Sequence, residues 1–257
     1  MNPSTLAACI GLAVFGAACV DEMDPPEVSS SIQELATDNG LPFINGLNTQ
    51  NGLNTQNGLN TQNGLNTQNG LSSNGALMAT AAGRTTVAYM VRCALPAGRS
   101  IVKKDPQGVS YTFPGGIGVA PLWEFGFCDQ RCQEWVSACM VAHINTAGVH
   151  IPLWVVADPF YQLQIGWSLS PTYPHQEGSF FGNIFQSPPR MYYCNGRDFD
   201  VNTVPGRIGS NSTRPYSNPW GYNASCDGRC TPSDWPYPNS GYKACNGYNA
   251  VFTVWRK

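Results

Sequence analysis

Eight of the ten cysteines lie in the C-terminal part of this 257-residue chain, and they constrain its fold more than any other feature. They are Cys93, Cys128, Cys132, Cys139, Cys194, Cys226, Cys230 and Cys245. An even cysteine count in an exported protein is typical of a disulfide framework, so these eight residues predict four disulfide bonds. Eight cysteines allow about 105 pairings, and the sequence alone does not fix the connectivity.

An apolar leader indicates that the chain is exported. Residues 6–20 carry no charge, and such a run is shorter than the roughly 20 residues that span a bilayer. It fits the apolar core of a secretory signal, which we assign to residues 1–19. Its end, Gly16–Cys19, resembles the lipobox of bacterial lipoproteins, which implies acylation of Cys19 and a membrane partner. An ordinary cleaved signal is the alternative, because lipoboxes prefer Leu at the position of Gly16.

Residues 20–75 have the composition of a linker. They contain six acidic residues and no Lys or Arg, and NGLNTQ occurs four times without error over residues 45–68. One Leu in each hexapeptide buries too little apolar surface to offset the entropy of ordering the chain. We expect a disordered spacer. The alternative is that the repeat self-associates and the protein is a structural component of the envelope.

Residues 76–257 have the composition of a globular domain. They contain all seven Trp and all eleven Tyr, and they carry 14 basic against 10 acidic residues, a net charge of +4. A domain of this length buries about 70% of the surface that its unfolded chain exposes, so it can form a core. The basic residues form no block, and we therefore expect no nucleic-acid partner.

The domain is predicted to be α+β, with two helices and mainly short strands. Apolar residues recur at helical spacing over 84–95 and 130–145, and Asp129 is a suitable N-cap for the second helix. Asp105-Pro106-Gln107-Gly108 predicts a hairpin between the strands that flank it. The further strands are predicted at 149–156, 160–165, 179–185, 190–194 and 250–255.

Two disulfides are suggested by local patterns. Cys93 and Cys139 both lie on or beside predicted helical apolar stripes, and Cys194 and Cys245 end similar strand-like segments, MYYCNG and YKACNG. The other four cysteines form two C-D-x-R-C motifs. Spacings of this kind also suit a four-thiolate zinc site, although export favours disulfides and we expect no cofactor.

A thiol hydrolase of the envelope is an alternative function. Cys128 and Cys132 begin a predicted helix, where the helix dipole lowers the pKa of a thiol. His150 and His175 follow in or near predicted strands and are candidate bases. A metal site formed by these two histidines and His143 is a weaker alternative, because His143 falls on the apolar stripe of its helix and suits the core.

The segment 216–242 is the predicted ligand-binding surface. Its aromatic residues alternate with Asn, Asp and Gly, a pattern that suits the flat faces and hydroxyl groups of sugars, and equally a protein interface. The candidate ligand-binding residues are Tyr216, Trp220, Tyr222, Trp235, Tyr237 and Tyr242. An irregular loop that packs its own aromatic side chains is the alternative interpretation.

The whole chain resembles predicted bacterial lipoproteins in which Asn-Gly-Leu repeats precede a Cys-rich domain. The resemblance rests on the NGLNTQ array, on Leu95–Gly98, on Trp135–Cys139, on Glu177–Asn183 and on Lys243–Gly247. It implies a location at the cell envelope and no particular activity. We therefore expect an exported, lipid-anchored protein that binds a glycan or a protein.

Overall fold

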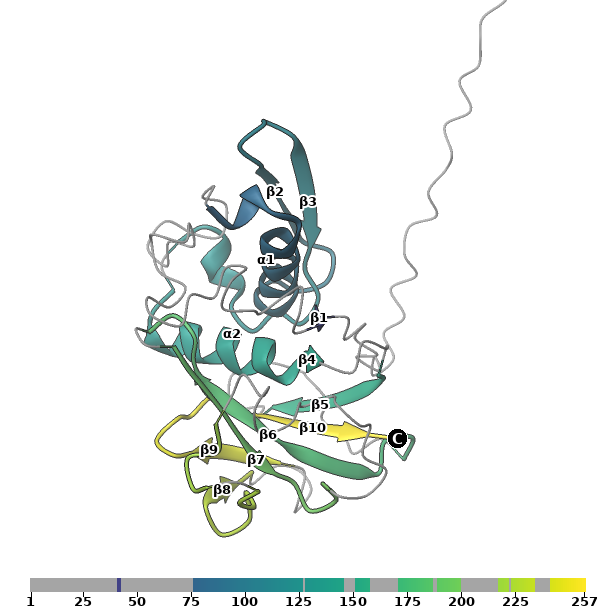
Figure 1. Cartoon of the computed structure of the whole chain (residues 1–257), viewed down its shortest axis with the longest axis vertical. Coiled ribbons are helices and arrows are strands. Elements are labelled where there is room, and N and C mark those ends of the chain that lie inside the picture. The colour runs from purple at the N-terminus through teal and green to yellow at the C-terminus, as the bar shows by residue number, and fades with distance from the viewer. Residues whose placement is uncertain are drawn as a thin grey trace, which may run out of the picture. The chain divides into compact units, whose positions relative to one another are not determined.

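The computed structural model describes residues 41–42, 76–126, 128–145, 151–157, 171–186, 189–199, 217–221, 223–233 and 241–257. All of them belong to one unit, Ile32–Lys257. Its fold is α+β, with two helices and mostly short strands, as the sequence predicts (Figure 1). The signal peptide, with Cys19, and nearly all of the predicted linker lie outside the described residues.

Both predicted helices are present, but the first begins three residues before the predicted start and the second ends three residues before the predicted end. Helix α1 spans Ala81–Ala94 and follows a short 3-10 turn, η2, at Ala76–Ala79. The Thr80 hydroxyl accepts a hydrogen bond from the N–H of Gly83 at 3.0 Å, which caps α1. Helix α2 spans Gln130–Ala142, and a second 3-10 turn, η3, precedes it at Pro121–Glu124.

The strands are short and form small sheets. Their bounds are Leu41–Pro42 (β1), Ser100–Lys104 (β2), Ser110–Pro114 (β3), Ile144–Asn145 (β4), Leu153–Ala157 (β5), His175–Asn183 (β6), Arg190–Asn195 (β7), Cys230–Pro232 (β8), Tyr242–Cys245 (β9) and Phe252–Arg256 (β10). Strands β2 and β3 form the predicted hairpin, β8 pairs with β9, and β1 pairs with β4. The remaining four form the central sheet in the order β5-β10-β6-β7, with antiparallel neighbours.

The central sheet packs on both faces. Side chains alternate along a strand, so Phe180 and Tyr193 point toward the main core while their neighbours Phe181 and Tyr192 belong to the opposite face. Helix α2 covers the first face and lies between the sheet and α1 (Figure 1). The second face packs against the β8–β9 hairpin and its cysteines.

Most predicted strands are confirmed with shifted ends. The strands predicted at 179–185, 190–194 and 250–255 correspond to β6, β7 and β10, and β5 occupies the end of the predicted 149–156. The strand predicted at 160–165 lies outside the described residues. Strand β9 corresponds to the strand-like segment that ends at Cys245. The short strands β1, β4 and β8 are not predicted, because two or three residues carry too little pattern.

Candidate functional site

The two candidate thiols are joined to each other. Cys128 and Cys132 form a disulfide with a Cα–Cα distance of 5.2 Å. Asp129, between them, is the N-cap of α2, and its carboxylate accepts a hydrogen bond from the backbone N–H of Cys132 at 2.8 Å. The helix therefore begins at a cross-linked turn, and neither sulfur is available as a nucleophile in this state.

The candidate base His175 is far from this disulfide. His175 begins β6, whereas α2 contacts the other end of that strand: Asn183 donates a hydrogen bond to the Gln133 side chain at 3.1 Å. Nine residues of strand separate the two ends by about 26 Å. The structure does not bring Cys132 and His175 together, and His150 lies outside the described residues.

The hypothesis of one zinc ion held by both C-D-x-R-C motifs is wrong for the oxidised chain. Cys128 and Cys132 pair within their motif, but Cys226 pairs with Cys194 and Cys230 pairs with Cys245. A sulfur in a disulfide has no thiolate to offer a metal. The identical spacing of the two motifs therefore serves two different structures, a helix cap and a turn that enters β8.

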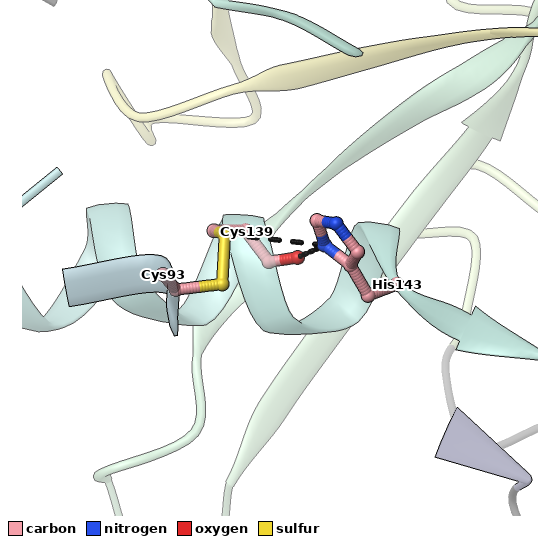
Figure 2. Close-up of side chains that lie close together, drawn as sticks. All are labelled: Cys93, Cys139 and His143. Carbon is pink, nitrogen blue, oxygen red and sulfur yellow. Dashed lines mark hydrogen bonds between the residues drawn. A yellow bond between two sulfur atoms is a disulfide. The ribbon is translucent and has the colours of Figure 1, made fainter. Parts of the chain in front are cut away.

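The predicted disulfide between Cys93 and Cys139 is confirmed. It joins α1 to α2 inside the core, and the side chain of His143 lies beside it (Figure 2). Nδ1 of His143 lies 2.7 Å from the carbonyl oxygen of Cys139 and 3.9 Å from its sulfur. Because a carbonyl oxygen only accepts, Nδ1 carries the proton and has no lone pair for a metal. His143 is a core residue that caps the last turn of α2, as its apolar stripe predicts.

The predicted disulfide between Cys194 and Cys245 is wrong. Cys245 is directly opposite Cys230 in the β8–β9 ladder and bonds to it. Cys194, on β7, bonds instead to Cys226, whose backbone N–H donates to the Asn195 carbonyl at 2.9 Å. The two disulfides touch, since the sulfurs of Cys194 and Cys230 are 3.6 Å apart. The two similar segments therefore lie next to each other in the fold, but their cysteines do not bond to each other.

A group of aromatic side chains lies over these two disulfides. We call it the aromatic cluster, and it consists of Phe181, Tyr192, Trp220 and Tyr248. Phe181 is buried at its centre, with ring centroids 5.7 Å from Tyr192 and 6.0 Å from both Trp220 and Tyr248. Tyr192 and Trp220 are only half-buried, so parts of their rings face solvent.

Backbone hydrogen bonds position Trp220 on the sheet. The segment that carries it follows β7, with the N–H of Tyr193 donating to the Ser217 carbonyl at 3.1 Å and the N–H of Asn195 donating to the Ala224 carbonyl at 3.0 Å. The Asn218 side chain accepts from the N–H of Trp220 at 3.2 Å. A disulfide closes the same segment at Cys226. The Trp220 ring is thus held on a cross-linked support.

Charged residues act on Tyr248 at the edge of the aromatic cluster. Arg190 is exposed on the same face of β7 as Tyr192. Burial raises the pKa of Tyr248, and a hydrogen bond between Arg190 and the Tyr248 side chain acts against that shift. The carboxylate of Glu134 also acts on Tyr248 and accepts a hydrogen bond from Gln130 at 2.8 Å. Flat rings with polar groups at their edge can bind a ligand that is apolar on one face and polar at its rim.

The two predicted ligand-binding residues that the structure describes differ in burial, although they belong to the same hydrophobic cluster. Trp220 belongs to the aromatic cluster, whereas Tyr242 is buried on β9 and its hydroxyl donates to the Asp227 carboxylate. Burial, with this hydrogen bond, raises the pKa of Tyr242. Tyr242 therefore has a structural place rather than an exposed one. The other four candidates, Tyr216, Tyr222, Trp235 and Tyr237, lie outside the described residues.

Sequence reasoning missed the cluster members outside 216–242. Tyr192 and Tyr248 each lie within three residues of a cysteine of the paired disulfides, and Tyr192 shares the strand face of Cys194. That alternation is a signal that places Tyr192 on the cross-linked face, and Tyr248 follows Cys245 closely in the chain. Phe181 gave no such signal, because β6 is buried on both faces and its sequence does not distinguish them.

Comparisons with known proteins add no family to this description. No family model, curated protein or solved structure matches the chain. Within the described residues, no helix has the length and apolar character needed to cross a membrane. The function must be argued from the residues themselves.

Proposed function

We propose that this is an exported, lipid-anchored protein of the cell envelope whose C-terminal domain binds a glycan through the aromatic cluster. The observation that carries the proposal is the partly exposed residue Trp220, whose ring packs against Phe181 beside Tyr192. The C–H groups of a pyranose face are weakly positive and are attracted to the negative face of an aromatic ring. The exposed guanidinium of Arg190, beside Tyr248, supplies donors for hydroxyl groups.

Two features favour binding over catalysis. Cys128 and Cys132 are oxidised to one disulfide, and His175 lies at the far end of β6 from them. The aromatic cluster instead rests on two disulfides that need no movement to present Trp220. A support that is already ordered loses little entropy on binding, which favours affinity.

A binding screen with a matched variant tests the glycan proposal. The full exported chain is titrated with a panel of envelope and extracellular polysaccharides, and Trp220→Ala is titrated with every glycan that binds. We expect Trp220→Ala to weaken binding about 30-fold, the effect of losing one central aromatic contact. Phe125→Ala is the control, because it removes an exposed aromatic ring from another surface. Unchanged affinity in Trp220→Ala overturns the proposal. If no glycan binds and a protein binds instead, the ligand is not a glycan.

The lipid anchor has a separate test. We expect a cell that exports the chain to attach fatty acid to Cys19, so metabolic labelling with a tagged fatty acid labels the wild type and not Cys19→Ser. An unlabelled wild-type protein that begins after residue 19 contradicts the anchor and leaves a secreted binding protein.

A further inference from the structure

Two large apolar side chains on one turn are exposed to solvent. Leu122 is 82% exposed and Phe125 is 75% exposed, more than any other large hydrophobic residue that the structure describes. They stand at the first turn before α2, in η3 and at its C-cap. Residues three apart in a 3-10 turn lie above one another, so both side chains point from the same side. We call this pair the apolar tip.

The core holds the apolar tip in place. Trp123, between the two exposed residues, is 1% exposed and packs edge-on against Phe185 with ring centroids 5.6 Å apart. The N–H of Phe125 donates to the Leu122 carbonyl at 3.2 Å, which closes the turn. The disulfide at Cys128 follows directly. The turn that exposes these two side chains is therefore held by the buried Trp123 and by the disulfide that follows it.

A basic residue accompanies the tip. The guanidinium carbon of Arg99 lies 5.1 Å from the centre of the Phe125 ring, and its Nη2 is 2.7 Å from the Glu124 carboxylate. The acid beside the tip is thus paired and does not repel an anionic surface. Residues 76–257 carry a net charge of +4 against −6 for residues 20–75, so any attraction to an anionic surface comes from the domain and not from the whole chain.

We propose that the apolar tip inserts into the interfacial region of an anionic lipid bilayer, so that the domain touches the membrane to which its chain is tethered. The two side chains offer about 300 Å² of apolar surface, well below the roughly 800 Å² that each partner of a stable protein complex buries. Two such side chains suit a bilayer, where aromatic and aliphatic side chains settle at the headgroup level. The inference rests on the proposed lipid tether for its choice of membrane and is independent of glycan binding by the aromatic cluster.

Vesicle co-sedimentation tests the tip without the lipid anchor. The full chain carrying Cys19→Ser is mixed with vesicles of phosphatidylethanolamine and phosphatidylglycerol. We expect Leu122→Ser with Phe125→Ser to lower the partition coefficient at least about tenfold, since both apolar side chains are lost. The matched control is Val102→Ser with Val109→Ser, which removes two half-exposed apolar side chains near the β2–β3 hairpin and is expected to bind as the parent does.

Each result decides the proposal once folding is checked. An unchanged non-reduced mass shows that the variants keep their disulfides. Failure of the parent chain to sediment, an equal loss in the Val102/Val109 control, or full binding by the Leu122/Phe125 variant overturns the proposal. The last result, together with a complex between the parent and another protein that the variant cannot form, assigns the tip to a protein partner instead.

Discussion

Lys103 is the clearest case of a single residue whose chemistry is set by its place in the fold. It lies on β2, where alternate side chains face inward, and it is 2% exposed. Burial lowers the pKa of Lys103 from its ordinary 10.5 to about 8, because the charged form loses hydration. The unfolded chain keeps this proton up to about pH 10.5, so the unfolded state binds more protons between the two values.

Stability is therefore expected to rise with pH through this range. From pH 8 to pH 9, below the ionisation of the tyrosines, the free energy of unfolding should increase by about 1 kcal/mol from Lys103 alone. Lys103→Met should remove that increase, because it keeps the apolar stem and has no proton to lose. Urea unfolding at several pH values measures both. A wild-type curve that falls between pH 8 and pH 9 contradicts the assignment.

Tyr242 and Trp220 are both aromatic residues of the predicted binding segment, but they differ in role. The hydroxyl of Tyr242 donates to the Asp227 carboxylate beside the β8–β9 hairpin, and its ring is buried. Tyr242→Phe should lower the free energy of unfolding by about 1.5 to 3 kcal/mol, since a carboxylate loses its donor, and should leave glycan affinity unchanged. Thermal unfolding and titration measure the two effects. A weaker glycan complex with normal stability would instead place Tyr242 at the ligand.

At the scale of elements, the periodicity of the sequence predicts the helices and longer strands of the main core, but it does not predict the short strand that a disulfide joins to its neighbour. Helix α2 could be predicted because its apolar stripe is long and Asp129 caps it. Strand β8 could not, because it has three residues and ends in Pro232. It pairs with β9 where Cys230 faces Cys245. Only Trp220 of the aromatic cluster was among the predicted ligand-binding residues, because Phe181, Tyr192 and Tyr248 lie outside residues 216–242.

The paired disulfides give the hairpin an alternative connection. The sulfurs of Cys194, Cys230 and Cys245 all lie within 4.8 Å of one another. In Cys230→Ser, the thiolate of Cys245 can attack the sulfur of Cys194, forming a Cys194–Cys245 bond and releasing Cys226 as the thiolate, with no net oxidation. We expect alkylation and peptide mapping to find the free thiol on Cys226 as well as on Cys245.

A matched variant separates this exchange from general scrambling. Cys132→Ser leaves Cys128 without its partner, and Cys128 belongs to no such group of three potential ligands among the described residues. Its free thiol should therefore stay on Cys128. A free thiol found only on Cys245 in Cys230→Ser contradicts the exchange. Scrambling in both variants would show that the close approach of the three sulfurs does not direct the exchange.

At the scale of the whole molecule, the central four-stranded sheet is covered differently on its two faces. Helix α2 and the main core cover one face, and that core also includes residues of α1 and of the β2–β3 hairpin. The other face carries the paired disulfides and the aromatic cluster. The first face follows from apolar periodicity, whereas the second follows from cross-links. The proposed binding surface thus lies on the face where disulfides replace helix packing.

The central claim is that the eight cysteines of the domain are structural and that the domain binds rather than catalyses. Non-reducing peptide mapping of the full exported chain, alkylated before digestion, tests it most directly. The account predicts the pairs 93–139, 128–132, 194–226 and 230–245, with no alkylation of these cysteines and a mass about 8 Da below the reduced form. Alkylated Cys128 or Cys132 in the native protein would contradict it and restore a reactive thiol at the start of α2.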